Sequence, residues 1–270
     1  MPTRNQTKRM NADCHYFKAA SKEIKSWILS QSTVKEESLT DWLLYDISRN
    51  IGGVVYFPFS RHVEGKTTGA DWEWWFLFPR FAIRMRVQAK RIHPQVDNYE
   101  GLAYKKKTCS QVDKLLSDSA KTNSLPFYAF FSAESHHNKC RKGVVDEGVF
   151  LAAASQVYSE FVNGRAHRAT SEALQEISLP LSCFTCCPLR SIQDSSRGMK
   201  RFLDHYFPIE SGEVALEDSA SAVPSGNGIH EELPDYVGQI LEQSQAANKE
   251  KSLIDLPEDV GAVVIADWRE

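Results

Sequence analysis

Residues 70–92 read ADWEWWFLFPRFAIRMRVQAKRI and contain two runs of aromatic, β-branched and other apolar residues. Pro79 separates the two runs, and a proline interrupts a strand because it cannot donate a hydrogen bond to the ladder. We therefore predict two adjacent strands, over 70–78 and 81–92. We expect these two strands to form a hairpin at the centre of the fold.

Upstream of the hairpin the sequence predicts two helices and a short strand. Apolar residues recur at helical spacing over 14–30 and again over 35–49. GGVVYFPF (52–59) is typical of a strand entered through a glycine turn. Downstream, a polar and basic connection leads to a helix at 110–123 and a strand at 125–133. This order predicts an α/β fold with a mixed central sheet flanked by helices.

The rest of the chain is expected to extend this core towards the C-terminus. The predicted elements are a helix at 145–162, an apolar extended segment at 177–189, helices at 196–206 and 234–245, and a strand at 261–268. We assign residues 1–210 to one α/β domain with its core at about 35–133. We assign 211–232, rich in Ser, Gly and acids, to a mobile acidic linker, and 233–270 to a helix and strand that pack on the same domain.

The composition is that of an ordinary globular protein: 42% of the 270 residues are hydrophobic and 25% are charged. No window approaches the 18 or so uninterrupted apolar residues of a membrane-spanning helix. The N-terminal segment is charged and has no apolar core of a secretory signal. We therefore expect a cytoplasmic protein with no membrane partner.

The cysteines cluster only in SCFTCCP (182–188). A zinc site would need a second Cys or His pair at ligand spacing, and none follows this motif. The surroundings are apolar, and a free cysteine there behaves as a small hydrophobic residue. We therefore expect core cysteines in this cluster rather than metal ligands.

The charges are distributed unevenly along the chain. Residues 80–122 contain ten Lys or Arg against four acids, whereas 211–260 contain eleven acids and two lysines. A basic stretch of this kind can follow a polyanion, and a solvated charged face is an equal alternative. Within it, the lysine run Lys105, Lys106 and Lys107 and the neighbouring Arg91 are candidate phosphate contacts.

The candidate catalytic residues are Asp71, Gln88 and Lys90, with an acid upstream at Glu36 or Glu37. Phosphodiester hydrolysis by a divalent metal needs oxygen ligands on a rigid frame and a cation near the attacking water. Side chains alternate along a strand, so Gln88 and Lys90 point to the same face of the sheet. Each residue has an ordinary structural alternative, and the order of the residues along the chain favours the catalytic interpretation.

Further acids and aromatic residues lie close to these positions. Glu64 and Glu73 are additional candidate ligands, although Glu73 could instead pair with Arg84 or Arg86 on the adjoining strand. The tryptophans at 72, 74 and 75 could stack on bases, but consecutive aromatic residues in a strand more often belong to the core.

This arrangement resembles the PD-(D/E)xK nuclease superfamily, and within it the Mrr-type restriction enzymes, where the middle acid is often Gln, as in VQAK (87–90). The stretch TGADWEWWF…RVQAKR is also similar to that of an uncharacterised bacterial domain family. The resemblance covers about residues 35–133 and implies a restriction-endonuclease-like core with a C-terminal helical extension.

The resemblance also implies roles for the candidate residues. Asp71 would ligate Mg²⁺ or Mn²⁺. Glu36 would either ligate the metal directly or form a hydrogen bond to one of its ligands. Gln88 would offer its amide oxygen, or mark the place where a neighbouring backbone carbonyl binds. Lys90 would orient the nucleophilic water. The sequence departs from the family pattern because no Pro precedes Asp71, and because Gln at 88 removes a negative charge that would help to hold the metal.

The function implied by the resemblance is metal-dependent endonucleolytic cleavage of DNA, with a role in antiviral defence. The implied partner is DNA, with a second copy of the chain or a protein of a defence system as further candidates. The alternative is a catalytically inactive nuclease fold that binds nucleic acid or a protein partner.

Overall fold

The aromatic and β-branched runs at 70–92 form the central hairpin of the computed structural model. Strand β2 (Trp72–Leu77) pairs antiparallel with β3 (Ala82–Arg91), in a register that sets Trp72 opposite Val87. Every residue of β2 is buried, and β3 is buried along nearly its whole length. The hairpin predicted from the sequence is therefore confirmed, and it lies inside the molecule.

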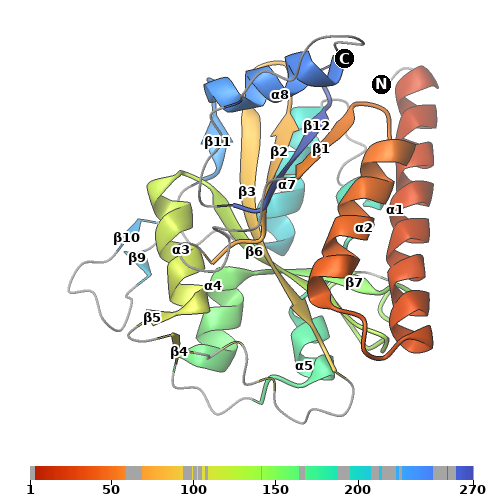
Figure 1. The fold of residues 1–270 in the computed structure, drawn as a ribbon, viewed down its shortest axis with the longest axis vertical. Coiled ribbons are helices and arrows are strands. Elements are labelled where there is room, and N and C mark those ends of the chain that lie inside the picture. The colour runs from red at the N-terminus through yellow and green to blue at the C-terminus, as the bar shows by residue number, and fades with distance from the viewer. Residues whose placement is uncertain are drawn as a thin grey trace.

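The structure describes residues 4–58, 69–93, 99, 102, 105–106, 109–140, 142–163, 168–187, 195–207, 213–214, 223–224, 227–245, 254 and 260–269. Figure 1 shows the arrangement of the elements along the chain. Two candidate site residues, Glu64 and Lys107, lie outside the described residues.

The hairpin lies in a mixed central sheet with the strand order β1-β12-β2-β3-β6-β7-β8. The further strands are β1 (Val54–Pro58), β12 (Ala262–Asp267), β6 (Leu125–Phe131), β7 (Val149–Ala153) and β8 (Leu179–Pro180). Strand β12 runs parallel to β2, and β6 runs parallel to β3, whereas the other neighbours in this order are antiparallel. The predicted α/β fold with a mixed sheet is thus confirmed.

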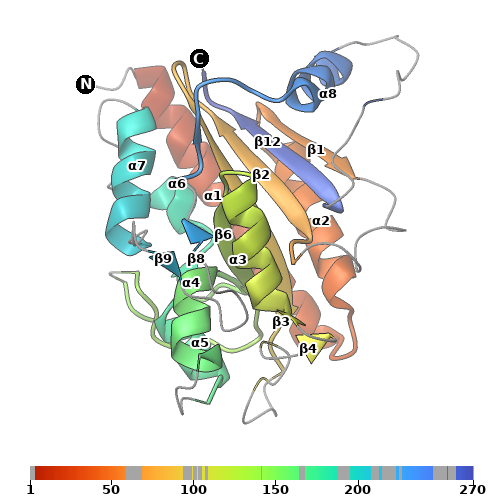
Figure 2. The ribbon, with the colours of Figure 1, turned by 90° about the vertical axis from the view of Figure 1, so that its left-hand side faces the viewer.

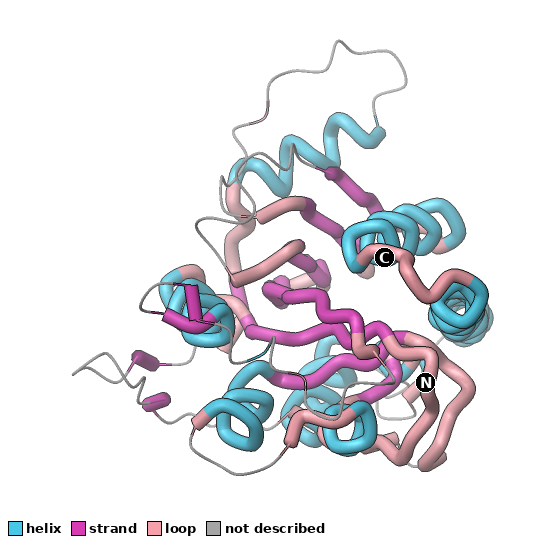
Figure 3. Tube along the Cα trace, turned by 60° about the horizontal axis from the view of Figure 1, so that its bottom comes forward, coloured by secondary structure: helices cyan, strands magenta, loops and turns pink. Residues whose placement is uncertain are grey.

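One face of the sheet is covered by helices from both halves of the chain. These are α1 (Arg4–Ser30), α2 (Glu36–Asn50), α6 (Cys183–Cys186) and α7 (Ser195–Tyr206). Their buried side chains form one core cluster with alternate residues of the strands, among them Trp72, Trp74 and Phe76. Figure 3 shows the strands running between helices on their two sides.

The opposite face is covered by α3 (Gln111–Lys121), α4 (Ala154–Val157), α5 (Ser171–Glu176) and α8 (Asp235–Gln245) (Figure 2). This second core cluster includes Trp75 and residues of β6, β7 and β12. All three tryptophans of β2 are at most 1% exposed, so they belong to the core, and base stacking by them is excluded. Because Met85, Val87 and Ala89 belong to the first cluster, the alternating polar residues Arg84, Arg86 and Gln88 of β3 face this side.

Two predicted segments after β6 differ in the structure. Residues 145–162 do not form one helix, because Val149–Ala153 is strand β7, followed by α4 and a π-helical turn (Tyr158–Val162). A short buried apolar run has no periodicity that separates a strand from a helix. The apolar segment 177–189 is not extended throughout, since it turns into α6 after β8. The first of these corrections adds strand β7 to the sheet.

The predicted mobile linker 211–232 contributes strand β11 (Ile229–His230), which pairs antiparallel with β3. The short strands β9 (Glu213–Val214) and β10 (Val223–Pro224) pair with each other in the same segment. None of the described helices is long and apolar enough to cross a membrane.

The cysteine prediction needs one correction. Cys183 and Cys187 are free and buried, as core residues should be. Cys186, however, forms a disulfide with Cys14, which joins α6 to α1 across 172 residues of sequence. Local spacing carries no information about a partner at that separation.

Candidate active site

Asp71 and Gln88 lie side by side where β2 begins and β3 approaches its end. The Asp71 N–H donates to the Val87 carbonyl at 2.8 Å, which continues the hairpin register by one residue. Oδ2 of Asp71 accepts hydrogen bonds from the Ala89 N–H at 2.6 Å and from Nε2 of Gln88 at 2.5 Å. The carboxylate is therefore fixed on the sheet face that carries Gln88 and, by alternation, Lys90.

Gly69 explains how the chain reaches this position. A Cβ built on Gly69 would lie 2.5 Å from the Gln111 carbonyl oxygen and 2.6 Å from the Leu115 nitrogen. The backbone therefore passes directly against the first turns of α3, an approach that only glycine allows. Asp71 follows two residues later and so enters the sheet beside α3.

Gln111, the first residue of α3, extends the polar network. Its Nε2 donates to Oε1 of Gln88 at 2.7 Å, so that Asp71, Gln88 and Gln111 form a hydrogen-bonded chain. A capping box between Ser110 and Asp113 fixes the start of the helix. Gln88 is only 2% exposed, and both the nitrogen and the oxygen of its amide are hydrogen-bonded. Nothing in the sequence pattern singled out Gln111, because its partner comes from another element.

Lys90 pairs with Glu36, the first residue of α2. Nζ of Lys90 lies 3.5 Å from Oε1 of Glu36, while Oε2 accepts the Arg91 N–H at 2.7 Å. Burial raises the pKa of Glu36, and the charge of Lys90 opposes this effect. Glu37 is exposed, so Glu36 is the helix acid that reaches the site.

Arg91, a candidate phosphate contact, is bound to the protein itself. Its guanidinium donates to the backbone carbonyls of Ser32, at 2.6 Å, and Val34. The residue is 6% exposed. Arg91 therefore holds the connection between α1 and α2, and we assign it a structural role. Lys105 and Lys106 form β4 (Lys105–Lys106), and their side chains lie outside the described part of the structure.

Tyr128 lies on β6 and is paired in register with Gln88 of β3. It is fully buried, and within the described residues its hydroxyl has no hydrogen-bond partner. Burial raises its pKa, and the charges of Asp71, Asp113 and Glu36 add to this effect. The charges of three carboxylates, distant from one another in sequence, thus raise the pKa of this one hydroxyl. The second oxygen of Asp113, Oδ1, also lacks a partner among the described groups.

Glu73 lies further along β2 in a separate ion cluster. Its Oε2 lies 2.6 Å from Arg84 and 3.4 Å from Arg86, on the neighbouring strand. Its Oε1 accepts from the Trp75 indole at 2.6 Å and from the Tyr236 hydroxyl. Glu73 is completely buried, and these four partners satisfy its carboxylate. It therefore pairs with both arginines and is not placed to act as a second ligand.

The donors available for a divalent cation are few. In the part of the chain that the structure describes, no three His, Cys, Asp or Glu side chains gather as a metal-ligand group. The oxygen donors at the site are the carboxylates of Asp71 and Glu36, the Gln88 amide and the Ala89 carbonyl, which itself accepts from Gln88 Nε2 at 3.1 Å. Hard oxygen donors of this kind fit Mg²⁺, which binds through one or two carboxylates and keeps several waters.

The fold and this site define an α/β protein whose polar residues converge at the end of a buried hairpin, between α2 and α3. The chain belongs to the family of unknown function DUF6615, whose pattern matches residues 13–267. No curated protein and no solved structure matches the chain.

Proposed function

We propose that this protein is a divalent-metal-dependent nuclease that hydrolyses DNA phosphodiester bonds, with a core of the PD-(D/E)xK kind. The observation that carries the proposal is the hydrogen bond between Asp71, directly before β2, and Gln88 on β3, with Lys90 on the same face. A carboxylate, an amide oxygen and an ammonium group in this order are suited to hold a cation and a water beside a phosphate.

Mg²⁺ or Mn²⁺ would be held by Asp71, by the Gln88 amide oxygen or the Ala89 carbonyl, and by Glu36 directly or through a hydrogen bond. When bound, the ion supplies positive charge at the scissile phosphate and lowers the pKa of water. Gln88 Nε2 donates to Asp71, so its amide must turn if its oxygen is to become a ligand. The Ala89 carbonyl accepts from the same Nε2 at 3.1 Å, so this turn of the amide would also release the carbonyl.

Lys90 is the residue proposed to orient the attacking water. Its ammonium group is 3.5 Å from Glu36, and the Lys90 side chain is only 12% exposed. This ion pair limits the positions that a long, flexible side chain can take, which reduces the entropy lost when the water is aligned. Glu36 is thus a positioning residue for Lys90.

DNA is the proposed substrate, and the cytoplasm is the proposed setting. A role in defence against foreign DNA, a second copy of the chain and a partner protein are proposed only by analogy with nucleases of this kind. The second candidate function is nucleic-acid binding without cleavage. It is favoured by the Gln at 88 and by the two protein donors that already occupy Oδ2 of Asp71.

Metal-dependent thermal stability tests the proposed site. A ligand that binds the folded state at a hundred times its Kd stabilises it by about 2.7 kcal/mol. We expect Mg²⁺ or Mn²⁺ to raise the Tm of the wild type, and Asp71→Asn to remove that increase. Glu37→Gln is the matched control, because Glu37 is exposed and should leave the increase unchanged. DNA binding in a gel shift without any metal response would favour the second candidate.

A further inference from the structure

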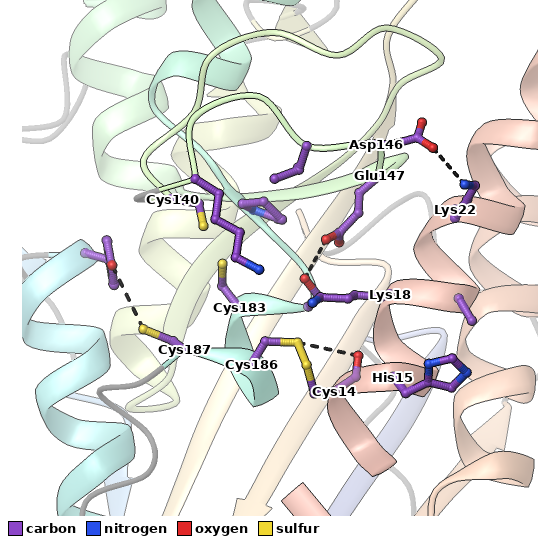
Figure 4. Close-up of a pocket in the computed structure, with 16 residues that line it drawn as sticks. Cys14, His15, Lys18, Lys22, Cys140, Asp146, Glu147, Cys183, Cys186 and Cys187 are labelled. Carbon is purple, nitrogen blue, oxygen red and sulfur yellow. Dashed lines mark hydrogen bonds and ion pairs between the residues drawn. A yellow bond between two sulfur atoms is a disulfide. The ribbon is translucent and has the colours of Figure 1, made fainter. Parts of the chain in front are cut away.

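Five of the six cysteines surround one pocket on the opposite side of the sheet from Gln88 and α3. The pocket lies between α1, α6, α7 and the segment before β7, and its volume is about 650 Å³ (Figure 4). Its lining includes the cysteines Cys14, Cys140, Cys183, Cys186 and Cys187. No part of the proposed nuclease site contributes to this lining.

A disulfide and free thiols lie together in this pocket. Cys14 and Cys186 form the disulfide, and both are half-buried, so their sulfur atoms border the cavity. Cys183 is free and buried, and burial raises the pKa of its thiol. A thiol with a raised pKa is a poor nucleophile at neutral pH. Burial therefore disfavours attack on the disulfide by Cys183, while the cavity leaves room for a thiol from outside.

The charges around the pocket favour an anionic ligand. Three lysines line it, Lys18, Lys22 and Lys142, and Lys18 points into the cavity from α1. Asp146 lies 2.9 Å from Lys22 and 2.7 Å from Lys25, so two lysines share this carboxylate. Glu147 is buried and accepts a hydrogen bond from Ser182 at 2.6 Å; burial raises its pKa, and the charge of Lys18 opposes this effect. The lining thus carries three lysines against two acids, Asp146 and Glu147, which leaves an excess of positive charge beside the disulfide.

We propose that this pocket binds a small anionic thiol, which exchanges with the Cys14–Cys186 disulfide. The thiolate attacks one cysteine sulfur and forms a mixed disulfide, while the electron pair of the broken bond leaves on the other cysteine as a thiolate. A second thiolate then attacks the mixed disulfide and releases the oxidised small molecule. Both cysteines take up a proton from water, and two electrons have passed to the protein.

The exchange would release the link between α1 and α6. In a reducing compartment small thiols are abundant, so this disulfide would be held in equilibrium with its reduced form. The inference does not depend on the proposed nuclease activity.

The test compares two small thiols of similar size on the intact, oxidised protein: anionic 3-mercaptopropionate and neutral 2-mercaptoethanol. Disulfide reduction is followed by alkylating the released thiols and measuring the protein mass. We expect the rate to saturate with the anionic thiol and to rise linearly with the neutral one. A linear dependence for both thiols would overturn the inference.

Charge variants identify the binding residues. The anionic-to-neutral rate ratio should fall by up to about fivefold for each of Lys18→Gln and Lys142→Gln, the size of an exposed charge interaction. Because the ratio is taken within one variant, a general change in disulfide reactivity cancels. Lys121→Gln, on α3 across the sheet and with its side chain 71% exposed, should leave the ratio unchanged. In the wild type the ratio should also fall with added salt, and a ratio indifferent to both changes would contradict the proposal.

Discussion

At the residue scale, the behaviour of the site depends on the Gln88 amide. Its nitrogen donates to Asp71 and its oxygen accepts from Gln111, so the amide links a strand carboxylate to the first residue of α3. An acid at this position would carry the same shape but could not donate to Asp71. Gln88 therefore stabilises the site without a cation, while it contributes less negative charge to hold one.

Gln88→Glu separates these two effects. In EDTA we expect the free energy of unfolding to fall by roughly 1–3 kcal/mol, because two carboxylates would face each other in a buried position. With Mn²⁺ added, the variant should gain more stability than the wild type. Chemical denaturation with and without the ion measures both changes. A variant as stable as the wild type in EDTA would show that the Gln88–Asp71 hydrogen bond is not as described.

Tyr128→Phe tests the buried hydroxyl beside the site. Because this hydroxyl has no hydrogen-bond partner among the described residues, its removal should leave the free energy of unfolding unchanged or raise it by up to about 1 kcal/mol. If the hydroxyl contacts substrate or its water, cleavage should fall at the same time. Urea denaturation is the measurement, and a loss of more than 1 kcal/mol would mean that the hydroxyl has a structural partner.

At the scale of elements, the central hairpin positions the site, and neighbouring helices approach it closely. Two glycines allow this approach, Gly69 against α3 and Gly148 against α1. A Cβ on Gly148 would lie 2.6 Å from the Lys25 nitrogen and 2.8 Å from its Cα, both in the α1 backbone. The Gly148 N–H also donates to the Ser21 carbonyl at 2.9 Å.

Gly148→Ala should therefore force α1 away from β7 and lower the free energy of unfolding by roughly 1–3 kcal/mol. Gly238→Ala is the matched control. It lies within α8 with nothing within 4 Å of the added Cβ, so alanine should stabilise the helix by up to about 1 kcal/mol. Opposite signs are expected for the two variants in the same urea titration, and equal effects would contradict the described packing.

Elements with a clear pattern could be predicted from the sequence. Helices α2 and α3 follow from helical spacing, and the hairpin and β6 follow from runs of aromatic and β-branched residues. The shared sheet face of Gln88 and Lys90 follows from the alternation of side chains along a strand. Strand β7 was missed because VFLAA is a short buried run without periodicity. Gln111 and Tyr128 were missed because their places beside Gln88 depend on tertiary packing. The choice of Glu36 over Glu37 likewise depends on how α2 docks against the end of β3.

At the scale of the whole molecule, distant parts of the chain are joined in one structure. Strand β12, close to the C-terminus, lies between β1 and β2, and the disulfide ties α1 to α6. A cross-link over 172 residues restricts the unfolded chain strongly. The state of this disulfide therefore affects the stability of the whole molecule.

Cys186→Ser should lower the free energy of unfolding by roughly 2–5 kcal/mol under oxidising conditions. In the presence of a strong reductant, the variant and the wild type should be nearly equal. Cys140→Ser, which removes a free thiol from the same pocket but keeps the disulfide, is the control and should lose as much stability as the wild type when the reductant is added. A variant that is equally destabilised with and without reductant would show that Cys186 acts through packing alone.

Cleavage of supercoiled plasmid DNA tests the proposed nuclease most directly. The wild type is incubated with Mg²⁺ or Mn²⁺ beside Asp71→Asn, Lys90→Ala and the exposed control Glu37→Gln, each checked for its folded state. We predict nicked and linear products from the wild type and the control, and none from the two site variants or in EDTA. Products that persist in Asp71→Asn and Lys90→Ala, or their absence from the wild type under every metal condition, would contradict the assignment of this site.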